Sequence, residues 1–381
     1  MKFEPFELER IQSLNENRVD VNLSESGIDP MSLKELMSEA ELEELLSLPL
    51  GYGHTIGEPK LRERIASLYK GHTASNVLVT SGSSEAIFLT ATLLLSDEDE
   101  LLMMTPNYLS MSGIAKFLGA KVRFIPLEEE SDWSWNLDKL RNSVSQNTKL
   151  ISLCNPNNPT GSIMKIEDMK EVARIADSVG AYIHSDEVYI GAEINHPLTT
   201  SFQSLYEKTI VTSGLSKSLA HPGVRIGWMA TKEKLIEDAW GIKDYTTISS
   251  SILSQYIACK VLEPETMKAI RVRTENLLIR NLEAFNNWIT PFSHFLSFIP
   301  PKAGGFVYVR YNIDVNSTNL VHNLMENESV FVVPGDSFGM DGFFRIGLGS
   351  DTRTFMRGLD LITKGFHRMF PEIVLQAGGR G

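Results

Sequence analysis

"TSGLSKSLAHPGVRIG", residues 212–227, is the stretch around which the rest of the chain can be placed. One lysine, Lys217, lies in it, in a turn of small residues between two strand-like runs. A lysine amine with open space around it can act as a covalent nucleophile toward a carbonyl carbon and form a Schiff base. We therefore expect this turn to follow a strand and to carry chemistry.

Apolar runs alternate with segments of helical periodicity over most of residues 52–240. The segment "KIEDMKEVARIADSVG", for example, ends on Gly180, a residue type that commonly ends helices. Continuous apolar strands that alternate with helices are typical of an α/β fold with a mostly parallel central sheet. The predicted strands cover residues 76–80, 100–105, 121–127, 149–154, 180–186 and 209–213.

The C-terminal part has a different pattern. A long helical segment covers residues 252–288, and the strand-like runs "GGFVYVRY", "SVFVVPG" and "FFRIGLG" follow it. This order predicts a smaller α+β domain, against which the N-terminal residues, lacking a core of their own, are expected to pack. We place the large domain at residues 46–280 and the small domain at residues 1–45 and 281–381. A cleft between the two is the expected ligand site.

Composition narrows the possible functions. The chain has 381 residues and a formal net charge of −12, which argues against a general binder of nucleic acids or anionic membranes. With only Cys154 and Cys259, no CxxC motif and no histidine cluster, we expect neither a disulfide framework nor a metal site. The N-terminal region lacks a signal-peptide core, and no apolar run is long enough for a bilayer, so we expect a cytoplasmic protein without a membrane partner.

Polar and small residues follow four of the predicted strands, and ligands of an open α/β sheet bind outside the carboxyl ends of its strands. At the first end, Gly82, Ser83 and Ser84 stand between a strand and a helix. Free backbone N–H groups and the positive end of a helix can bind a phosphate there. The alternative is an ordinary serine N-cap with Glu85 in the first turn.

The other strand ends add an amide, a carboxylate and a phenol. The rigid turn "LCNPNNPTG" could point the amide of Asn158 at a ligand. In "HSDEVYIG", Asp186 could meet a cationic ring nitrogen and Tyr189 could reach the same place, although a helix cap or a solvated loop residue would also explain the carboxylate.

A hydrolase elbow is one alternative for the lysine turn. "GLSKS" nearly matches G-x-S-x-G, with Ser216 as the nucleophile. Ser218 stands where the strained elbow needs glycine, and no acid-then-histidine order follows. The sequence therefore gives this alternative little support.

Taken together, "NPNNPTG", "SDEVY" and "SKSLAHPGVRIGW" resemble the signatures of the fold-type-I pyridoxal-phosphate aminotransferases of class I/II, and the likeness covers nearly the whole chain. The resemblance implies pyridoxal 5′-phosphate as cofactor, bound by Lys217 as a Schiff base. It implies that Asp186 pairs with the pyridinium nitrogen and that Tyr189 and Asn158 donate to the phenolic oxygen, with Asn158 also near the substrate. A buried carboxylate would keep the ring nitrogen protonated, and Lys217 would need a lowered pKa to act as a general base.

The same resemblance assigns residues around the ring and the substrate. Tyr108 matches the aromatic residue that stacks on the ring, with a plain core tyrosine as the alternative. Tyr52 is similar to the tyrosine that reaches the phosphate of a neighbouring subunit, which implies a homodimer with shared sites. Arg345 matches the arginine that binds the substrate α-carboxylate, with an exposed strand arginine as the alternative. Ser26 or Gly27 is the expected loop contact near that carboxylate.

A phosphate dianion needs N–H groups and a fixed cation. The family often has a phosphate-binding serine three residues before the lysine, where this chain has Gly214. Either Ser213 or Ser216 replaces it, or this contact is missing. The residues implied for the phosphate cup are Gly82, Ser83, Ser84, Ser216 and Arg225.

The resemblance implies a ping-pong aminotransferase that moves an amino group between an α-amino acid, most commonly aspartate, and a 2-oxo acid. Dicarboxylate specialists place a partner's arginine near "KDYTTISS", where this chain has Lys243 and Asp244. The neighbourhood also resembles capreomycidine synthase, so a lyase or cyclase for an amino acid with a cationic side chain is a second hypothesis, which Asp244 would suit. A surface ion pair of Asp244 with Lys243 is the alternative. A non-catalytic pyridoxal-phosphate-binding regulator is the third hypothesis.

Overall fold

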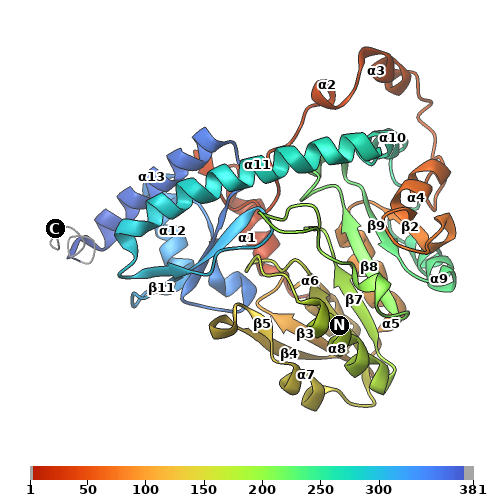
Figure 1. Ribbon diagram of the computed structural model, residues 1–381, viewed down its shortest axis with the longest axis horizontal. Helices are drawn as coiled ribbons and strands as arrows, with labels where there is room; N and C mark the ends of the chain where they lie inside the picture. The colour runs from red at the N-terminus through yellow and green to blue at the C-terminus, as the bar shows by residue number, and fades with distance from the viewer. Residues whose placement is uncertain (1–2, 373–381) are drawn as a thin grey trace.

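In the computed structural model, which describes residues 3–372, a twisted eight-stranded sheet forms the larger part of the molecule (Figure 1). Five of its strands, β8, β7, β6, β3 and β4, are parallel neighbours, and only β9, β2 and β5 pair antiparallel with the strand beside them. This confirms the predicted α/β fold. In sheet order the strands are β2 (Val77–Thr80), β9 (Gly227–Ala230), β8 (Thr209–Gly214), β7 (Tyr182–Asp186), β6 (Thr148–Cys154), β3 (Glu100–Thr105), β4 (Lys121–Glu128) and β5 (Ser134–Trp135).

Helices cover both faces of this sheet, which is why its central strands are apolar along their whole length. On one face α5, α6 and α9 bury Leu101 and Met103 of β3, and on the other α8 packs against Leu102 and Met104. The helix α8 ends where Gly180 adopts a left-handed conformation, as expected. The flanking helices are α4 (Pro59–Ala66), α5 (Ser83–Leu94), α6 (Ser110–Leu118), α7 (Leu137–Ser143), α8 (Ile166–Val179) and α9 (Glu233–Lys243).

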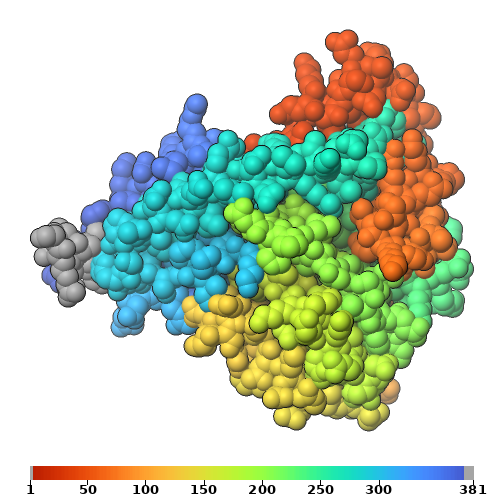
Figure 2. All heavy atoms as spheres, in the orientation of Figure 1, coloured from red at the N-terminus to blue at the C-terminus, as the bar shows by residue number. Residues whose placement is uncertain are grey.

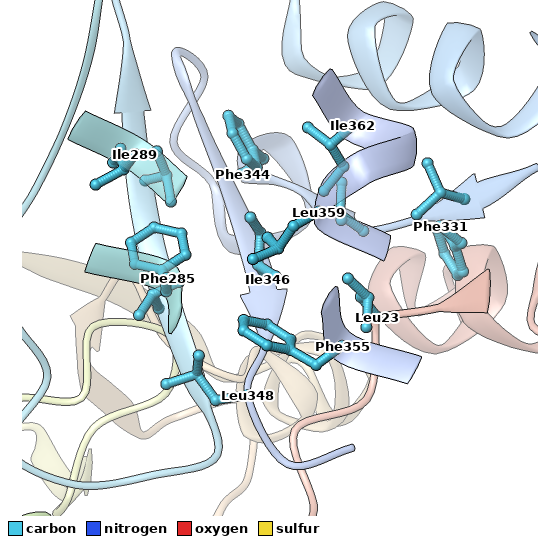
Figure 3. Close-up of a cluster of buried hydrophobic side chains, with 14 of the residues drawn as sticks. Leu23, Phe285, Ile289, Phe331, Phe344, Ile346, Leu348, Phe355, Leu359 and Ile362 are labelled. Carbon is cyan, nitrogen blue, oxygen red and sulfur yellow. The ribbon is translucent and has the colours of Figure 1, made fainter. Parts of the chain in front are cut away.

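A second, four-stranded antiparallel sheet lies among the C-terminal residues that the structure describes. Its strands, in order, are β10 (Leu296–Phe298), β11 (Phe306–Tyr311), β14 (Phe343–Gly347) and β13 (Val333–Pro334). The helices α12 (Ser317–Glu328) and α13 (Thr352–Met369) pack on it, and Phe344 and Ile346 of β14 meet Phe355 and Leu359 of α13 in its core (Figure 3).

The predicted long helix is two helices, α10 (Ile252–Val261) and α11 (Pro264–Ile289). Proline has no N–H to continue the hydrogen-bond ladder and fits the first turn of a helix, so α11 starts anew at Pro264. The 26 residues of α11 run from the large sheet to the small one (Figure 1). This helix therefore ties the two sheets together.

The N-terminal residues take part in three regions. The strand β1 (Val21–Asn22) pairs with β12 (Val330–Phe331), whereas Leu8 of α1 (Glu7–Asn15) is buried with residues of the large sheet. The short helices α2 (Leu33–Leu36) and α3 (Glu39–Leu46) project from the body of the molecule beside α10 (Figures 1 and 2). The domain boundaries stay a prediction.

Short 3-10 turns connect several of these elements. They cover Ala74–Asn76, Glu129–Ser131, Phe202–Ser204, Pro222–Val224, Thr290–Phe292 and Gly335–Phe338. Among residues 3–372, no helix has the length and apolarity needed to cross a membrane.

Candidate active site

A cavity of about 510 Å³ lies at the carboxyl ends of β6, β7 and β8, between the two sheets. The N-terminal helix α1, the loop after β1 and the strand β14 complete its wall. The predicted residues that line it are Ser26, Ser83, Ser84, Tyr108, Asn158, Asp186, Tyr189, Ser216, Lys217, Arg225 and Arg345. The tertiary structure therefore brings together residues that are up to 319 positions apart, from Ser26 to Arg345.

Lys217 and Asp186 are ionisable residues of the cavity whose pKa values are shifted by burial. The amine of Lys217 has no hydrogen-bond or ion-pair partner among the described residues, and burial lowers its pKa below the usual range. Burial raises the pKa of Asp186 to about 7, although a hydrogen bond from Val188 N and the charge of Lys217 oppose the shift. Such a carboxyl group is stabilised in its charged form when a cation lies beside it.

Two hydrogen-bonding side chains lie next to this pair. Tyr189 is buried against Phe306, and its hydroxyl lies 2.9 Å from Ser26 Oγ and donates to it. Asn158 Oδ1 accepts a hydrogen bond of 2.7 Å from Arg345 Nη1, which leaves its amide nitrogen free to donate. Burial also raises the pKa of Tyr189, so its hydroxyl stays protonated and can donate to a ligand oxygen in place of Ser26.

Arg345 is buried, and only 1% of its surface is exposed. Its guanidinium lies 5.5 Å from the ring centre of Phe306 and 5.1 Å from that of Phe338, and it also donates to Ser24 O. The Nε atom has no partner among residues 3–372. The alternative of an exposed strand arginine is therefore wrong, and the buried fork is suited to bind a carboxylate.

The first turn of α5 and Arg225 form a cradle at another side of the cavity. Gly82, with φ +87°, precedes the helix, so the N–H groups of Ser83 and Ser84 are free of intrahelical partners. A Cβ atom on Gly82 would come within 2.6 Å of Arg225 Nη2, which fills the place where a side chain would be. Arg225 also donates to Ser216 Oγ at 3.4 Å. Helix N–H groups and a fixed cation together suit a phosphate.

Gly214, where the family often has a serine, lies tightly against the neighbouring strand. A Cβ atom there would lie 3.0 Å from Ile226 O and 3.2 Å from Gly227 Cα of the neighbouring strand, which leaves little room for a side chain. Of the two expected substitutes, Ser213 donates to Glu187 O, away from the cradle, whereas Ser216 lines the cavity beside Arg225. Ser216 is therefore the better placed.

Three predicted positions do not line the cavity. Tyr52 lies on the surface with 74% of its area exposed. Gly27 packs behind the lysine turn, where a Cβ atom would lie 3.0 Å from Ser216 O. Gly82 adjoins the cavity through Arg225 without lining it.

The proposed surface ion pair of Lys243 is not found. Lys243 is buried, and its Nζ donates to Thr55 O at 3.2 Å and to Ile248 O at 2.7 Å. Asp244 follows the helix on the surface and does not line the cavity in this chain. The turn after α9 is thus stabilised by carbonyl groups around a buried ammonium.

The sequence analysis missed residues on the N-terminal side of the cavity. Glu9 and Gln12, which lie one helical turn apart, and Glu25, just after β1, all face it. Glu9 Oε1 accepts a hydrogen bond of 2.8 Å from the hydroxyl of Tyr108. The apolar Leu8 and the charged Glu9 stand side by side in a short helix, and only the spacing of Glu9 and Gln12 on one face could have pointed to them.

Comparisons with known proteins show the family of the chain. Residues 19–362 match the family described as aminotransferase class I and II. The aspartate aminotransferase of Pyrococcus abyssi is 29% identical over 364 residues, 91% of each chain, and the capreomycidine synthase of Streptomyces vinaceus is 27% identical over 350 residues, 90% of this chain and 89% of that one. The crystal structure of a PLP-dependent aminotransferase from Streptococcus suis has a TM-score of 0.91, with 30% identity over 97% of this chain and 99% of the other.

Proposed function

Because the chain belongs to the class I and II aminotransferases, we propose that it moves an amino group between an α-amino acid and a 2-oxo acid in a ping-pong reaction. The protein is a pyridoxal-phosphate-dependent enzyme, so the hypothesis of a non-catalytic regulator is set aside. The observation that carries the proposal is the meeting of Lys217, Asp186 and Arg345 around one cavity. Aspartate belongs among the donors to test, because the aspartate aminotransferase of Pyrococcus abyssi matches along 91% of the chain.

The donors around the cavity fit pyridoxal phosphate. The cradle of Ser83, Ser84 and Arg225, where a Cβ on Gly82 would collide, suits the phosphate, and the buried Asp186 suits a ring cation. When bound, the cofactor supplies an aldehyde carbon that reacts with amines and a ring that withdraws electrons from the substrate α-carbon.

The residues of the chain then have distinct roles. Arg345 binds the substrate α-carboxylate with two parallel hydrogen bonds and so orients the bonds at the α-carbon. Burial favours the neutral form of the Lys217 amine, which would take the α-proton as a general base. The same amine would return the proton at the aldehyde carbon of the cofactor. Asp186 holds a proton on the ring nitrogen, while Asn158 and Tyr189 donate to the ring oxygen.

The test is to mix the holoenzyme with single L-amino acids and to follow both the cofactor absorbance and the 2-oxo acid formed. A Lys217→Ala variant should lose activity by roughly a thousandfold or more. The matched control is Lys208→Ala, since Lys208 lies outside the cavity and donates to Gly180 O. Turnover by Lys217→Ala at the wild-type rate would overturn the proposal.

A lyase or cyclase is the second candidate, favoured by the likeness to capreomycidine synthase. Both reactions would use Lys217 as the base, but they differ in what happens without an oxo acid. A transaminase stops after one turnover with its cofactor in the amine form, whereas a lyase or cyclase continues to turn over and does not accumulate that form. A multiple-turnover assay with a single amino acid and no oxo acid therefore separates them.

We also propose a homodimer in the cytoplasm. Large apolar side chains of the segments 46–52 and 245–248 are exposed, which supports an interface there, and hydrogen bonds from Ser249 to Tyr52 O and from Trp240 to Thr55 hold the two segments together. Tyr52 would then reach the phosphate bound by the partner subunit. The exposed apolar residues are Leu46, Leu50, Tyr52, Tyr245 and Ile248.

A further inference from the structure

Two carboxylates in the cavity, those of Glu9 and Glu25, have no role in the proposed chemistry. Neither makes an ion pair within residues 3–372. They come from α1 and from the loop after β1, and not from the strand ends that hold Lys217 and Asp186. These carboxylates are therefore free to serve a part of the substrate other than its reacting centre.

The remaining charges of the cavity are accounted for by the proposed function. Arg225 belongs to the phosphate cradle, Arg345 to the α-carboxylate, and Lys217 and Asp186 to the cofactor. No further lysine, arginine or histidine lines the cavity among the described residues. A second carboxylate on the substrate would thus meet the two glutamates, and the described chain offers it no cation that lacks another role.

Both glutamates lie close enough to act on groups in the cavity. Burial lowers the pKa of Lys217, and the charge of Glu25 is the largest effect that opposes it, with Glu9 adding to it. Burial likewise lowers the pKa of Arg345, and the charges of Glu25 and Glu9 again act in the opposite direction. The field of the two carboxylates therefore extends over the place where an amino acid held by Arg345 would lie.

The geometry of Glu9 leaves it ready for a ligand. Its Oε1 atom accepts from Tyr108, whose ring is held edge-on by Phe6 at 4.9 Å, and no partner of Oε2 is found in the described chain. Tyr108 thus positions the carboxylate and does not neutralise it. The unpartnered amine of Lys217 and Nε of Arg345 independently mark the cavity as a place where a ligand binds.

We propose that Glu9 and Glu25 select amino acids whose side chain carries a guanidinium or ammonium group, and that they disfavour aspartate and glutamate. This substrate class rests on the proposed function, since it assumes that Arg345 holds the α-carboxylate. It applies equally to transamination and to cyclisation. Each carboxylate attracts a cationic side chain of the substrate and repels an anionic one. Attraction and repulsion both raise the ratio of the rate constant for a cationic substrate to that for an anionic substrate.

The test compares L-ornithine, L-arginine, L-norvaline and L-aspartate with the holoenzyme in single-turnover reactions, because norvaline has an ornithine-like chain without the charge. The ratio of the apparent second-order rate constant for ornithine to that for norvaline should exceed one, and aspartate should react more slowly than norvaline. Glu9→Gln and Glu25→Gln should each lower the ornithine-to-norvaline ratio on the order of tenfold. Glu7→Gln, on the same helix but outside the cavity, is the control and should keep the ratio.

A second readout does not depend on turnover. In the Lys217→Ala background, calorimetry should show that ornithine binds more tightly than norvaline, and that Glu25→Gln reduces this difference. Glu25→Lys should move the preference of the enzyme toward aspartate. A melting curve of each variant shows that it is folded.

The outcomes separate the two proposals. If aspartate reacts as fast as ornithine, or if the glutamine variants keep the wild-type ratio, the substrate class is wrong while the aminotransferase proposal stands. If none of a full set of amino acids changes the spectrum or yields a product, the proposed function itself fails.

Discussion

Arg345 donates a hydrogen bond of 2.7 Å to Asn158 across 187 positions of the chain. The bond joins β14 of the small sheet to the turn after β6 of the large one, so the proposed carboxylate-binding group is held by a residue proposed to contact the cofactor. Any change in the angle between the two sheets would displace the arginine from the lysine turn. The relative position of the sheets therefore sets the geometry of the candidate active site.

Arg345→Lys should lower kcat/KM for amino acids by roughly a hundredfold, with most of the loss in KM. A lysine keeps the charge but loses the planar fork that pairs with a carboxylate, and it cannot reach Asn158 and a ligand together. The measurement is steady-state kinetics. Arg310→Lys, an exposed arginine of the neighbouring strand β11 that pairs with Glu129, should leave both constants within a factor of two, and an equal effect of the two variants would contradict the role of Arg345.

Asp186→Asn should change how the stability of the cofactor-free protein depends on pH. Burial raises the pKa of Asp186 to about 7, so between pH 4 and pH 7 the folded state keeps a proton that the unfolded state has lost. The wild type should therefore lose stability relative to the variant as the pH rises, by about 2 to 3 kcal/mol from pH 5 to pH 8.

Urea unfolding at several pH values measures this difference. Glu187 and His184 also have shifted pKa values, but they occur in both proteins, so their contributions cancel to first order. With the cofactor bound, the order should reverse, because the ionised Asp186 then stabilises the ring cation. If the difference in unfolding free energy between the wild type and Asp186→Asn does not change with pH, this interpretation is wrong.

Gly82→Ala should weaken pyridoxal phosphate binding. The residue has φ +87°, and its new Cβ would come within 2.6 Å of Arg225 Nη2, so the arginine must leave the cradle. Gly71→Ala is a matched control, since Gly71 has φ +82° with open space around it. Both substitutions lose about 1 kcal/mol of stability because alanine is strained at a positive φ, but only Gly82→Ala also meets an arginine. Both variants should melt lower than the wild type, but only Gly82→Ala should raise the dissociation constant of the cofactor, measured by fluorescence titration.

Tyr52→Phe should lower cofactor affinity only if its hydroxyl reaches the partner's phosphate. Tyr52 is 74% exposed in the single chain, so a loss of affinity cannot come from its own core. Mixing Tyr52→Phe with Lys217→Ala subunits then gives a sharper check. In a hybrid dimer the intact Lys217 of one chain meets the intact Tyr52 of the other, and tight binding with activity should return. A mixture no more active than its two components would argue against shared sites.

The strands of the large sheet and the polar residues that follow them could be predicted, because both are recognised from neighbouring residues in the chain. Continuous apolar runs indicated buried parallel strands, and the residues just after them had to lie at one edge of the sheet, so Asn158, Asp186 and Lys217 could be grouped before any coordinates existed. The sequence analysis missed the helix break at Pro264 because the helical pattern continued across it. The proline itself was the signal, since it has no N–H for the helical hydrogen bond.

The sequence by itself determined the sheet and the edge at which the proposed catalytic residues lie, because strand periodicity and turn composition depend on neighbours in the chain. Only the tertiary structure decided that Glu9 and Glu25 line the same cavity as Lys217, that Lys243 is buried among carbonyls, and that Gly214 lies tightly against the neighbouring strand. Each of these depends on how separate elements pack, and packing is set by shape complementarity between segments distant in sequence, which no local pattern encodes.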